Sequence, residues 1–336
     1  MANDLLILGL SGTGIEFEYS GPAFDITVKA GKASIIPDNE ENYTRIAVYI
    51  GDERVKDMQI CHETSVIHID TTPGLNKIRL IKLSEVAMSL IGIEPLELPE
   101  STIIKPTPAL SHRIEFIGDS ITCGYGIDDE DPLHGFKTAT EDMTRALAYK
   151  TALALNADLS CFAASGYGIL SGYTDDPSTI NQKELIPPYY ETMGLSYDSI
   201  KGTPDTVNTM WNFSDFIPDA IVINLGTNDD SYCQDDKDKQ EKYRKLYIDF
   251  LKKVRSHNKD AYIFCALGLM GDRLYPIVCS AVNEYSETTG DTKISTIHLP
   301  EQDASAGYVA DYHPLESAHE KAAHATVAAI RRTLGW

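Results

Sequence analysis

The chain has 336 residues, of which 43% are hydrophobic and 24% are charged, so it is long enough for two globular domains with sizeable cores. Its formal net charge of −21 disfavours binding to nucleic-acid backbones and to anionic membrane surfaces. We therefore expect neither nucleic acid nor a membrane as a partner.

Residues 1–105 show the pattern of a β-sandwich. Apolar and polar residues alternate with a period of two in Ile15–Tyr19 and in Phe24–Val28. Further strands are expected at Arg45–Ile50, Ser65–Asp70, Asn76–Leu83 and Ser89–Leu98. Short strands separated by Gly, Pro and Asn residues are typical of all-β sandwiches. The following stretch 99–110 contains three prolines and is expected to be an extended linker.

Residues 106–336 show a different pattern, in which apolar strands alternate with helices. The expected strands are Arg113–Ile117, Leu159–Ala163, Ala220–Leu225, Ala261–Leu267 and Lys293–Leu299. The expected helices are Asp142–Leu155, Lys239–Ser256, Leu274–Thr288 and Leu315–Leu334. This alternation predicts an α/β domain with a doubly wound parallel sheet, which binds ligands beyond the carboxyl ends of its strands.

One segment of the second domain, residues 171–213, is long, aromatic and interrupted by proline and glycine. A weakly structured excursion of this length in a compact domain is usually a lid or a binding loop. Trp211 in this segment could contact a bound ligand, or it could be an anchor in the core beneath the sheet.

The compartment is predicted from the cysteines and the N-terminal residues. The six cysteines show no C-x-x-C pair and no zinc-finger spacing, which indicates reduced thiols, and no metal site is expected. The apolar run Leu5–Leu10 is too short for a signal peptide and follows Asp4 instead of basic residues. We expect a cytoplasmic protein, or a secreted one if a signal peptide has been removed.

Candidate chemical groups follow three successive predicted strands. Gly118-Asp119-Ser120 would expose a hydroxyl group, Ser165-Gly166-Tyr167-Gly168 would bring backbone N–H groups close to a ligand, and Gly226-Thr227-Asn228-Asp229 would offer a side-chain amide. Taken alone, each of these could be an ordinary loop, a tight turn or an Asx-turn. Their shared position after the strands makes the combination more specific than any single one.

A histidine completes this set near the C-terminus. In Asp311-Tyr312-His313-Pro314, His313 precedes the last predicted helix and could reach the same edge of the sheet as Ser120. Asp311 could orient the second ring nitrogen, as the carboxylate does in a Ser–His–Asp triad. His319 and His324 lie inside the predicted helix and are expected to be solvated or packed.

Together, Ser120, Gly166, Asn228 and His313 resemble the four blocks of the SGNH (GDSL-type) hydrolase superfamily. The segment from Trp211 to Asp229 and the stretch Gly12–Phe17 further resemble family two of the carbohydrate esterases. The resemblance implies a flavodoxin-like three-layer α/β/α catalytic domain at 106–336, preceded by a jelly-roll domain at 1–105. Position 310 is alanine where the superfamily usually has aspartate, so either a triad with Asp311 or a Ser–His dyad is expected.

The resemblance implies a serine esterase that removes O-acetyl groups from plant polysaccharides such as xylan or mannan, or from their oligosaccharides. The N–H groups of Ser120 and Gly166 and the amide of Asn228 would form the oxyanion hole, with no cofactor. Trp211, Tyr167 and Asp119 are expected to contact the substrate. Alternatives are a lipase or thioesterase acting on short acyl esters and a carbohydrate-binding protein. The sequence leaves the oligomeric state open, a homo-oligomer included.

Overall fold

The computed structural model describes residues 4–39, 41–196 and 198–336, which form two compact units. The first unit contains the described residues up to Ala109 together with Phe136–Glu141 and Thr192–Met210. The second contains Leu110–Gly135, Asp142–Glu191 and Trp211–Trp336. The expected domains 1–105 and 106–336 stay a prediction, because compactness does not show which part folds independently.

The first unit is a β-sandwich of two antiparallel sheets. The four-stranded sheet has the order β1-β8-β3-β6, with β1 at Leu6–Leu8, β3 at Phe24–Ala30, β6 at Thr64–Ile69 and β8 at Ile91–Ile93. The five-stranded sheet has the order β5-β4-β7-β2-β9, with β2 at Gly14–Ser20, β4 at Thr44–Ile50, β5 at Glu53–Ile60, β7 at Asn76–Lys82 and β9 at Ile103–Pro106. Inward-facing residues such as Ile26 and Val48 are fully buried, which confirms the expected sandwich.

Three strands of this unit differ from the sequence-based expectation. Strand β1 at Leu6–Leu8 was not predicted. The linker prediction for 99–110 is wrong in part, because Ile103–Pro106 pairs with β2 as an exposed edge strand. Proline is tolerated at an edge, where its missing N–H breaks no central ladder. Strand β5 at Glu53–Ile60 was not predicted either. It is also an edge strand, and its charged residues hide the apolar pattern that marks a buried strand.

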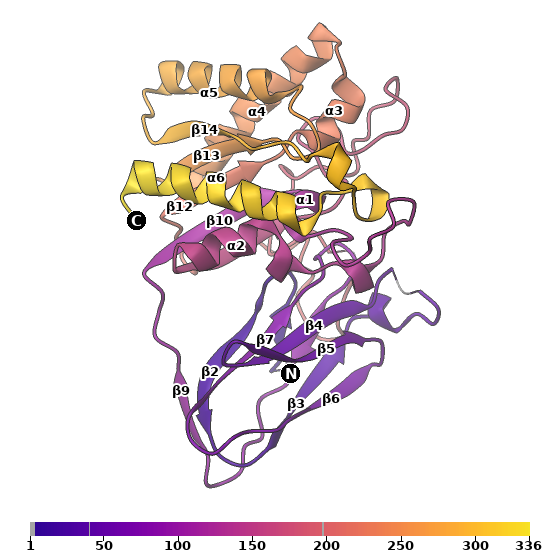
Figure 1. Ribbon diagram of the computed structural model, residues 1–336, viewed down its shortest axis with the longest axis vertical. Coiled ribbons are helices and arrows are strands. Elements are labelled where there is room, and N and C mark those ends of the chain that lie inside the picture. The colour runs from indigo at the N-terminus through magenta and orange to yellow at the C-terminus, as the bar shows by residue number, and fades with distance from the viewer. Residues whose placement is uncertain (1–3, 40, 197) are drawn as a thin grey trace. The chain divides into compact units, whose positions relative to one another are not determined.

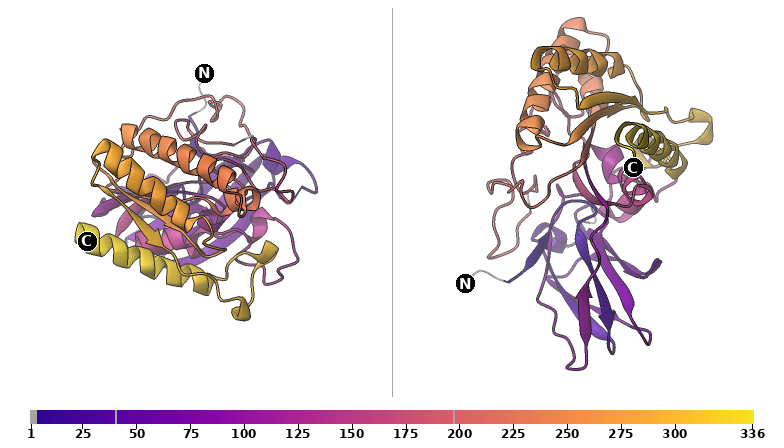
Figure 2. Two further views of the ribbon diagram at one scale, coloured as in Figure 1. Left: turned by 90° about the horizontal axis from the view of Figure 1, so that it is seen from above. Right: turned by 90° about the vertical axis from the view of Figure 1, so that its left-hand side faces the viewer.

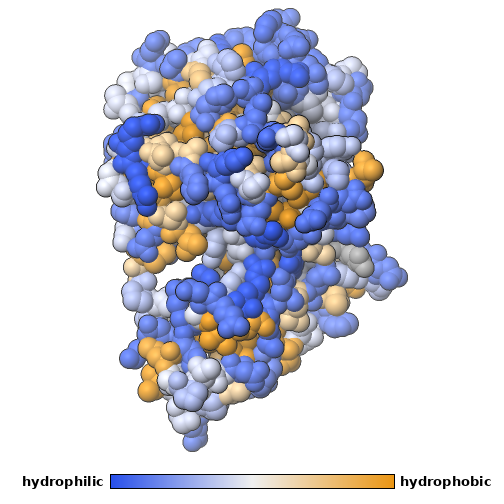
Figure 3. Space-filling model, viewed as in Figure 1, coloured by the Kyte–Doolittle hydropathy of each residue, from blue (hydrophilic) through white to orange (hydrophobic). Residues whose placement is uncertain are grey.

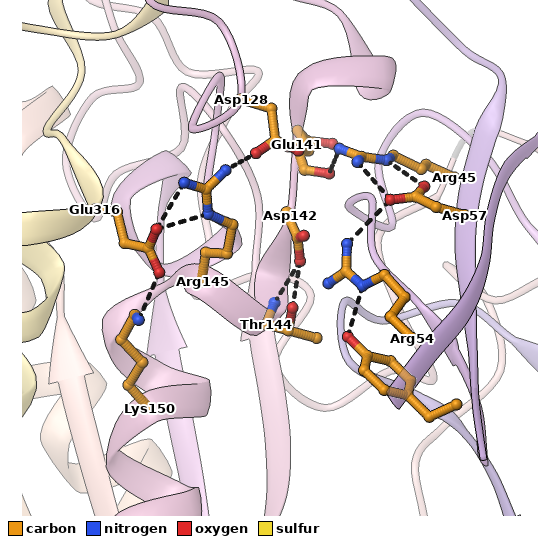
Figure 4. Close-up of polar contacts among 11 residues, drawn as sticks. Arg45, Arg54, Asp57, Asp128, Glu141, Asp142, Thr144, Arg145, Lys150 and Glu316 are labelled. Carbon is orange, nitrogen blue, oxygen red and sulfur yellow. Dashed lines mark hydrogen bonds and ion pairs between the residues drawn. The ribbon is translucent and has the colours of Figure 1, made fainter. Parts of the chain in front are cut away.

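Two segments from later in the chain are built into the first unit. The Asp198 carboxylate accepts hydrogen bonds from the N–H groups of Ala33 and Leu90, at 2.8 and 2.9 Å. The Glu141 carboxylate accepts one from the N–H of Glu85 at 3.0 Å, and its carbonyl accepts one from Arg45, as Figure 4 shows. The expected loop 171–213 is therefore not one excursion, because its middle part, Thr192–Met210, belongs to the sandwich unit.

The second unit is a three-layer α/β/α structure. Its five-stranded sheet has the order β11-β10-β12-β13-β14 and is parallel throughout, with β10 at His112–Gly118, β11 at Ala157–Ala163, β12 at Ala220–Asn224, β13 at Tyr262–Leu267 and β14 at Ile294–His298. This is the flavodoxin-like strand order, which confirms the predicted fold class.

Helices cover both faces of this sheet (Figures 1 and 2). The α-helices are α1 at Ser120–Cys123, α2 at Leu147–Ala154, α3 at Thr227–Cys233, α4 at Lys237–His257, α5 at Tyr275–Thr289 and α6 at Glu316–Leu334. Short 3-10 turns lie at Ala33–Ile35, Thr138–Thr140, Met143–Arg145, Ala304–Ala306 and Ala310–Tyr312. Helices α2 and α6 share a core with one sheet face, while α4 and α5 lie on the other (Figure 2).

The surface is mainly hydrophilic on the face that Figure 3 shows, and the cysteines are reduced thiols as the sequence predicts. Apolar side chains on this face lie in small separate patches (Figure 3). Over the described ranges, no helix has both the length and the apolar character needed to cross a membrane. All six cysteines are thiols outside any disulfide bond; Cys161 and Cys265 are buried, whereas Cys279 is only partly buried.

The strand order has a switch point where function is expected. Strand β10 pairs with β11 on one side and with β12 on the other, so the connections leave it in opposite directions. Ligands of doubly wound sheets bind at such a switch point, at the carboxyl ends of the strands. The three loops that follow β10, β11 and β12 carry Ser120, Gly166 and Asn228.

Candidate active site

The predicted nucleophile, Ser120, is the first residue of α1, directly after β10. The Asp119 carboxylate caps this helix by accepting a hydrogen bond from the N–H of Ile121 at 3.0 Å. Burial raises the pKa of Asp119 to about 7, although this hydrogen bond opposes the shift. Asp119 is fully buried beneath the serine, so its contact is with the helix that holds Ser120.

The structure brings His313 to this serine. Its Nε2 lies 2.8 Å from the Oγ of Ser120, and its Nδ1 lies 3.2 Å from the carbonyl oxygens of Ala310 and Asp311. A carbonyl oxygen only accepts hydrogen bonds, so Nδ1 carries the proton and Nε2 is free to accept one from Ser120. Loss of hydration in the site lowers the pKa of His313 to about 4, which keeps the ring neutral at physiological pH.

The Asp311 side chain faces another group. Its carboxylate accepts a hydrogen bond from the hydroxyl of Tyr125. The Tyr125 ring stacks on the ring of His313, with centroids 4.0 Å apart and an interplanar angle of 20°. Asp311 therefore contributes its main-chain carbonyl to the histidine, while its carboxylate is bound by a residue that sequence reasoning did not identify.

The loop after β11 presents glycine N–H groups to the site. Gly166 has φ 82°, a left-handed conformation that favours glycine. The N–H of Gly168 donates to the carbonyl of Glu184 at 3.0 Å, so it is already engaged. A side chain at 168 would also lie 2.0 Å from the carbonyl oxygen of Ser171. Of the two glycines, the geometry favours Gly166 as the donor to a reacting oxygen.

Asn228, on α3 after β12, ties the three loops together. Its Nδ2 donates to the carbonyl of Tyr167 at 2.8 Å and lies 3.5 Å from Oδ2 of Asp119. One amide proton is thus bound firmly, and the other makes only a long contact that a developing oxyanion could replace. A side-chain amide with a proton available in this way is the kind of donor that an oxyanion hole requires.

Asp229 is a further residue of the site that sequence reasoning missed. Its fully buried carboxylate accepts hydrogen bonds from the N–H groups of Ile169, Leu170 and Ser171, at 2.6–3.1 Å. Burial raises the pKa of Asp229 to about 6, against the effect of these three donors. The carboxylate thereby fixes the loop that carries Gly166. Its position directly after Asn228 is the only sequence signal that could have indicated this role.

An ion-pair network lies at the start of α6, the helix that follows the histidine turn (Figure 4). Arg145 pairs with Asp128 and donates to Glu316 at 2.6 and 2.8 Å, and Lys150 donates to Glu316 at 2.6 Å. Burial opposes ionisation of Glu316, but the hydrogen bonds from these two cations outweigh it and lower its pKa. Glu316 begins α6 just after His313, so the network fixes the start of that helix.

The structure does not bring all of the predicted substrate contacts to Ser120. The N–H of Trp211 donates to the carbonyl of Glu191, whose carboxylate pairs with Lys253 and His257. These two residues end α4, beside the points where the strands begin, so Trp211 lies at the opposite end of the sheet from Ser120. The Tyr167 side chain is only 3% exposed, and Asp119 lies beneath the serine.

Two other tyrosines are exposed beside the histidine turn. Tyr312, which directly precedes His313, is 55% exposed and packs edge-on against Tyr308. Tyr173 is 54% exposed, and its N–H donates to the carbonyl of Gly166 at 2.8 Å. Of the other histidines of α6, His319 is buried and accepts a hydrogen bond from the N–H of Leu147 at 3.3 Å, and His324 is exposed. Within the described parts of the chain, no His, Cys, Asp and Glu side chains gather as a metal site.

The comparison with protein families agrees with this geometry. Residues 116–321 match the model of the GDSL-like lipase/acylhydrolase family, a segment that includes Ser120, Gly166, Asn228 and His313. The chain belongs to the GDSL-like lipase/acylhydrolase family. This confirms the resemblance that the four sequence blocks indicated.

Known relatives of this GDSL-like hydrolase act on carbohydrates. The cellulase/esterase CelE of Acetivibrio thermocellus is 29% identical over 333 residues, which are 97% of this chain and 37% of CelE. An acetylxylan esterase/glucomannan deacetylase of Cellvibrio japonicus is 28% identical over 270 residues, covering 74% of this chain and 67% of that protein. The chain thus spans little more than a third of the length of CelE.

A solved structure extends the likeness to both units. The family two carbohydrate esterase of Clostridium thermocellum, solved in complex with cellohexaose, has a TM-score of 0.83 and 27% identity, and covers 99% of this chain and 96% of its own. The GDSL-like hydrolase therefore shares the sandwich as well as the α/β unit with that esterase. This likeness confirms the resemblance to family two of the carbohydrate esterases.

Proposed function

We propose that this GDSL-like hydrolase removes O-acetyl groups from plant polysaccharides, such as xylan or mannan, or from their oligosaccharides. The observation that carries the proposal is the 2.8 Å contact between Nε2 of His313 and Oγ of Ser120 at the carboxyl edge of the sheet. The likeness to esterases that act on xylan and glucomannan supports the substrate class. The exposed rings of Tyr173 and Tyr312 beside the site suit the faces of sugar rings.

The reaction follows from the geometry. His313 Nε2 accepts the hydroxyl proton of Ser120 while Oγ attacks the acetyl carbonyl carbon. The oxyanion accepts hydrogen bonds from the N–H groups of Ser120 and Gly166 and from the amide of Asn228. As the C–O bond to the sugar breaks, the proton on Nε2 passes to the departing sugar oxygen. Water, deprotonated by His313, then attacks the acetyl-enzyme. The proton on Nε2 passes to Oγ of Ser120 as the acyl bond breaks, and acetic acid leaves as acetate and a proton.

A Ser–His dyad is sufficient in this proposal. The carbonyl oxygens of Ala310 and Asp311 accept the Nδ1 proton, each at 3.2 Å, and so orient the ring as a carboxylate does in a triad. They also stabilise the imidazolium that forms during attack, though with less charge than a carboxylate would supply.

Kinetics of Ser120→Ala and His313→Ala with 4-nitrophenyl acetate test the proposal. Each variant should lose at least about a thousandfold in kcat, because nucleophile and base act as a unit. The exposed His324→Ala variant is the matched control and should keep wild-type rates. Near-wild-type activity in the serine or histidine variant would refute the proposed active site.

Two further assays separate the alternatives. A lipase or thioesterase should hydrolyse 4-nitrophenyl esters faster as the acyl chain lengthens, whereas the proposed enzyme should prefer acetate. Product NMR on acetylated xylo-, manno- and gluco-oligosaccharides would identify the sugar, and sugar binding without acetate release would favour a binding protein. The cytoplasmic location and a homo-oligomer stay predictions, which cell fractionation and sedimentation would test.

A further inference from the structure

Tyr125 links the nucleophile to the histidine. Its N–H donates to the carbonyl of Ser120 at 3.1 Å, directly after the Gly124 cap that ends the nucleophile's helix. Its ring stacks on His313, and its hydroxyl donates to the carboxylate of Asp311. The side chain is only 7% exposed, so these contacts are made in a largely dehydrated environment where a hydrogen bond is strong.

The turn at residues 310–313, which Tyr125 contacts, has an energetically unfavourable backbone conformation. Asp311 and Tyr312 both have left-handed conformations, with φ 49° and 57°. Such conformations cost on the order of 1 kcal/mol or more for each non-glycine residue, and tyrosine lacks the short polar side chain that eases the cost for aspartate. The surrounding structure must therefore hold this turn in place.

The unusual turn has a direct benefit for the histidine. It directs the carbonyls of Ala310 and Asp311 toward Nδ1 of His313. The loop after the nucleophile's helix holds the turn through its backbone, since the N–H groups of Ala310 and Asp311 donate to the carbonyls of Asp129 and His134, both at 2.9 Å. The hydrogen bond from Tyr125 adds a side-chain contact on Asp311.

We propose that Tyr125 is a positioning residue for the esterase reaction, which holds His313 by stacking and, through Asp311, holds the left-handed turn whose carbonyls orient the ring. This inference rests on the proposed function. It gives Asp311 a role different from that in a triad, because its carboxylate accepts the hydrogen bond of Tyr125 and acts on the imidazole only through its charge. In this proposal the hydroxyl of Tyr125 acts through Asp311.

The first test is Tyr125→Phe, which keeps the stacked ring and removes the hydroxyl. We expect kcat with 4-nitrophenyl acetate to fall about 10- to 100-fold, since small displacements of a catalytic group are costly, while KM changes less than twofold. The matched control is Tyr285→Phe on α5. It removes another tyrosine–aspartate hydrogen bond, in which the Tyr285 hydroxyl donates to the carboxylate of Asp291 at 3.2 Å. It should keep kcat within twofold.

The second test is a double-mutant cycle with Asp311→Ala. If the hydroxyl acts through Asp311, Tyr125→Phe should lower kcat no further in the Asp311→Ala background. The cost of placing alanine in the left-handed turn is present in both members of that comparison and cancels. Asp311→Asn should retain kcat within about threefold, because asparagine accepts the same hydrogen bond and tolerates the left-handed conformation.

Three results would overturn the inference: a kcat within twofold of wild type for Tyr125→Phe, an undiminished effect of Tyr125→Phe in the Asp311→Ala background, or a loss near the 10⁴-fold typical of a triad carboxylate in Asp311→Asn. Melting temperatures would show whether each variant is folded. If Tyr125→Phe were unfolded, the Asp311→Asn result alone would decide. An active Ser120→Ala would refute the proposed function itself, whereas an inactive Ser120→Ala with an unaffected Tyr125→Phe would refute only the positioning role.

Discussion

Glu115 is a buried carboxyl group on strand β10, and its replacement by glutamine should stabilise the second unit at alkaline pH. Its Oε2 accepts a hydrogen bond from the hydroxyl of Tyr190 at 2.9 Å, and that hydroxyl accepts one from Asn258 at 2.8 Å. The rings of Phe162 and Phe250 pack edge-on around Tyr190. Burial raises the pKa of Glu115 to about 7, and the hydrogen bond from Tyr190 only partly offsets it.

The sign and size of the effect follow from this pKa. The folded protein binds the proton more tightly than the unfolded chain, in which the pKa is 4.5, so stability is lost as pH rises from 4.5 through 7. At about 1.4 kcal/mol per pH unit, the loss amounts to about 3 kcal/mol above pH 8. Glutamine resembles the protonated acid and keeps an oxygen for Tyr190, so the variant avoids this loss.

Thermal unfolding at pH 5 and pH 8.5 would measure the effect. At pH 8.5, Glu115→Gln should raise the melting temperature of the second unit by roughly 6–12 °C, given about 2–4 °C per kcal/mol for a unit of this size. At pH 5 the gain should shrink to about 1 kcal/mol or less. The exposed Glu301→Gln is the matched control and should show no such pH dependence. Equal gains at both pH values would refute the assignment of a raised pKa to Glu115.

Three other predictions concern the active site and the sandwich. Only neutral His313 can act as a base, and its pKa is lowered to about 4. The value of kcat/KM should therefore stay level from pH 5 to 8 and fall tenfold per pH unit below about 4. An inflection of the pH profile near 6.5 would contradict this. Asn228→Ala should lower kcat about 10²–10³-fold in steady-state assays, and a loss below tenfold would argue against its oxyanion role. Asp198→Ala leaves the N–H groups of Ala33 and Leu90 without their acceptor. Urea denaturation should therefore show that the free energy of unfolding of the sandwich falls by about 3 kcal/mol. An unchanged denaturation midpoint would exclude this role of Asp198.

The parallel sheet could be predicted from the sequence because its strands are buried on both faces. Runs such as Ala220–Asn224 are almost wholly apolar. The bounds of α4, α5 and α6 differ little from the expected ones, whereas α2 begins at Leu147 and not at Asp142 as expected. Edge strands gave no comparable signal, as β5 and β9 show. Half of their surface faces water, and charged residues or proline are acceptable there.

The site was predictable only where side chains carry the chemistry. Ser120, Gly166, Asn228 and His313 follow apolar strands or precede a helix, so topology alone indicates that they converge. The carbonyls of Ala310 and Asp311 that face His313 are main-chain groups, which every residue has and no sequence pattern marks. The contact between Tyr125 and Asp311 joins residues 186 positions apart and depends on the left-handed turn, which is a tertiary feature.

The attachment of Asp198 to the sandwich constrains the order in which the chain can fold during synthesis. The N–H groups of Ala33 and Leu90 obtain their acceptor only after residue 198 has been synthesised. The N–H of Lys32 likewise obtains its acceptor, the carbonyl of Ser199, only after that residue has been synthesised. N-terminal domains generally fold first as the ribosome elongates the chain. Here the N-terminal unit cannot reach its final state until most of the first half of the α/β unit has also emerged, so the nascent chain carries an incomplete sandwich through that interval.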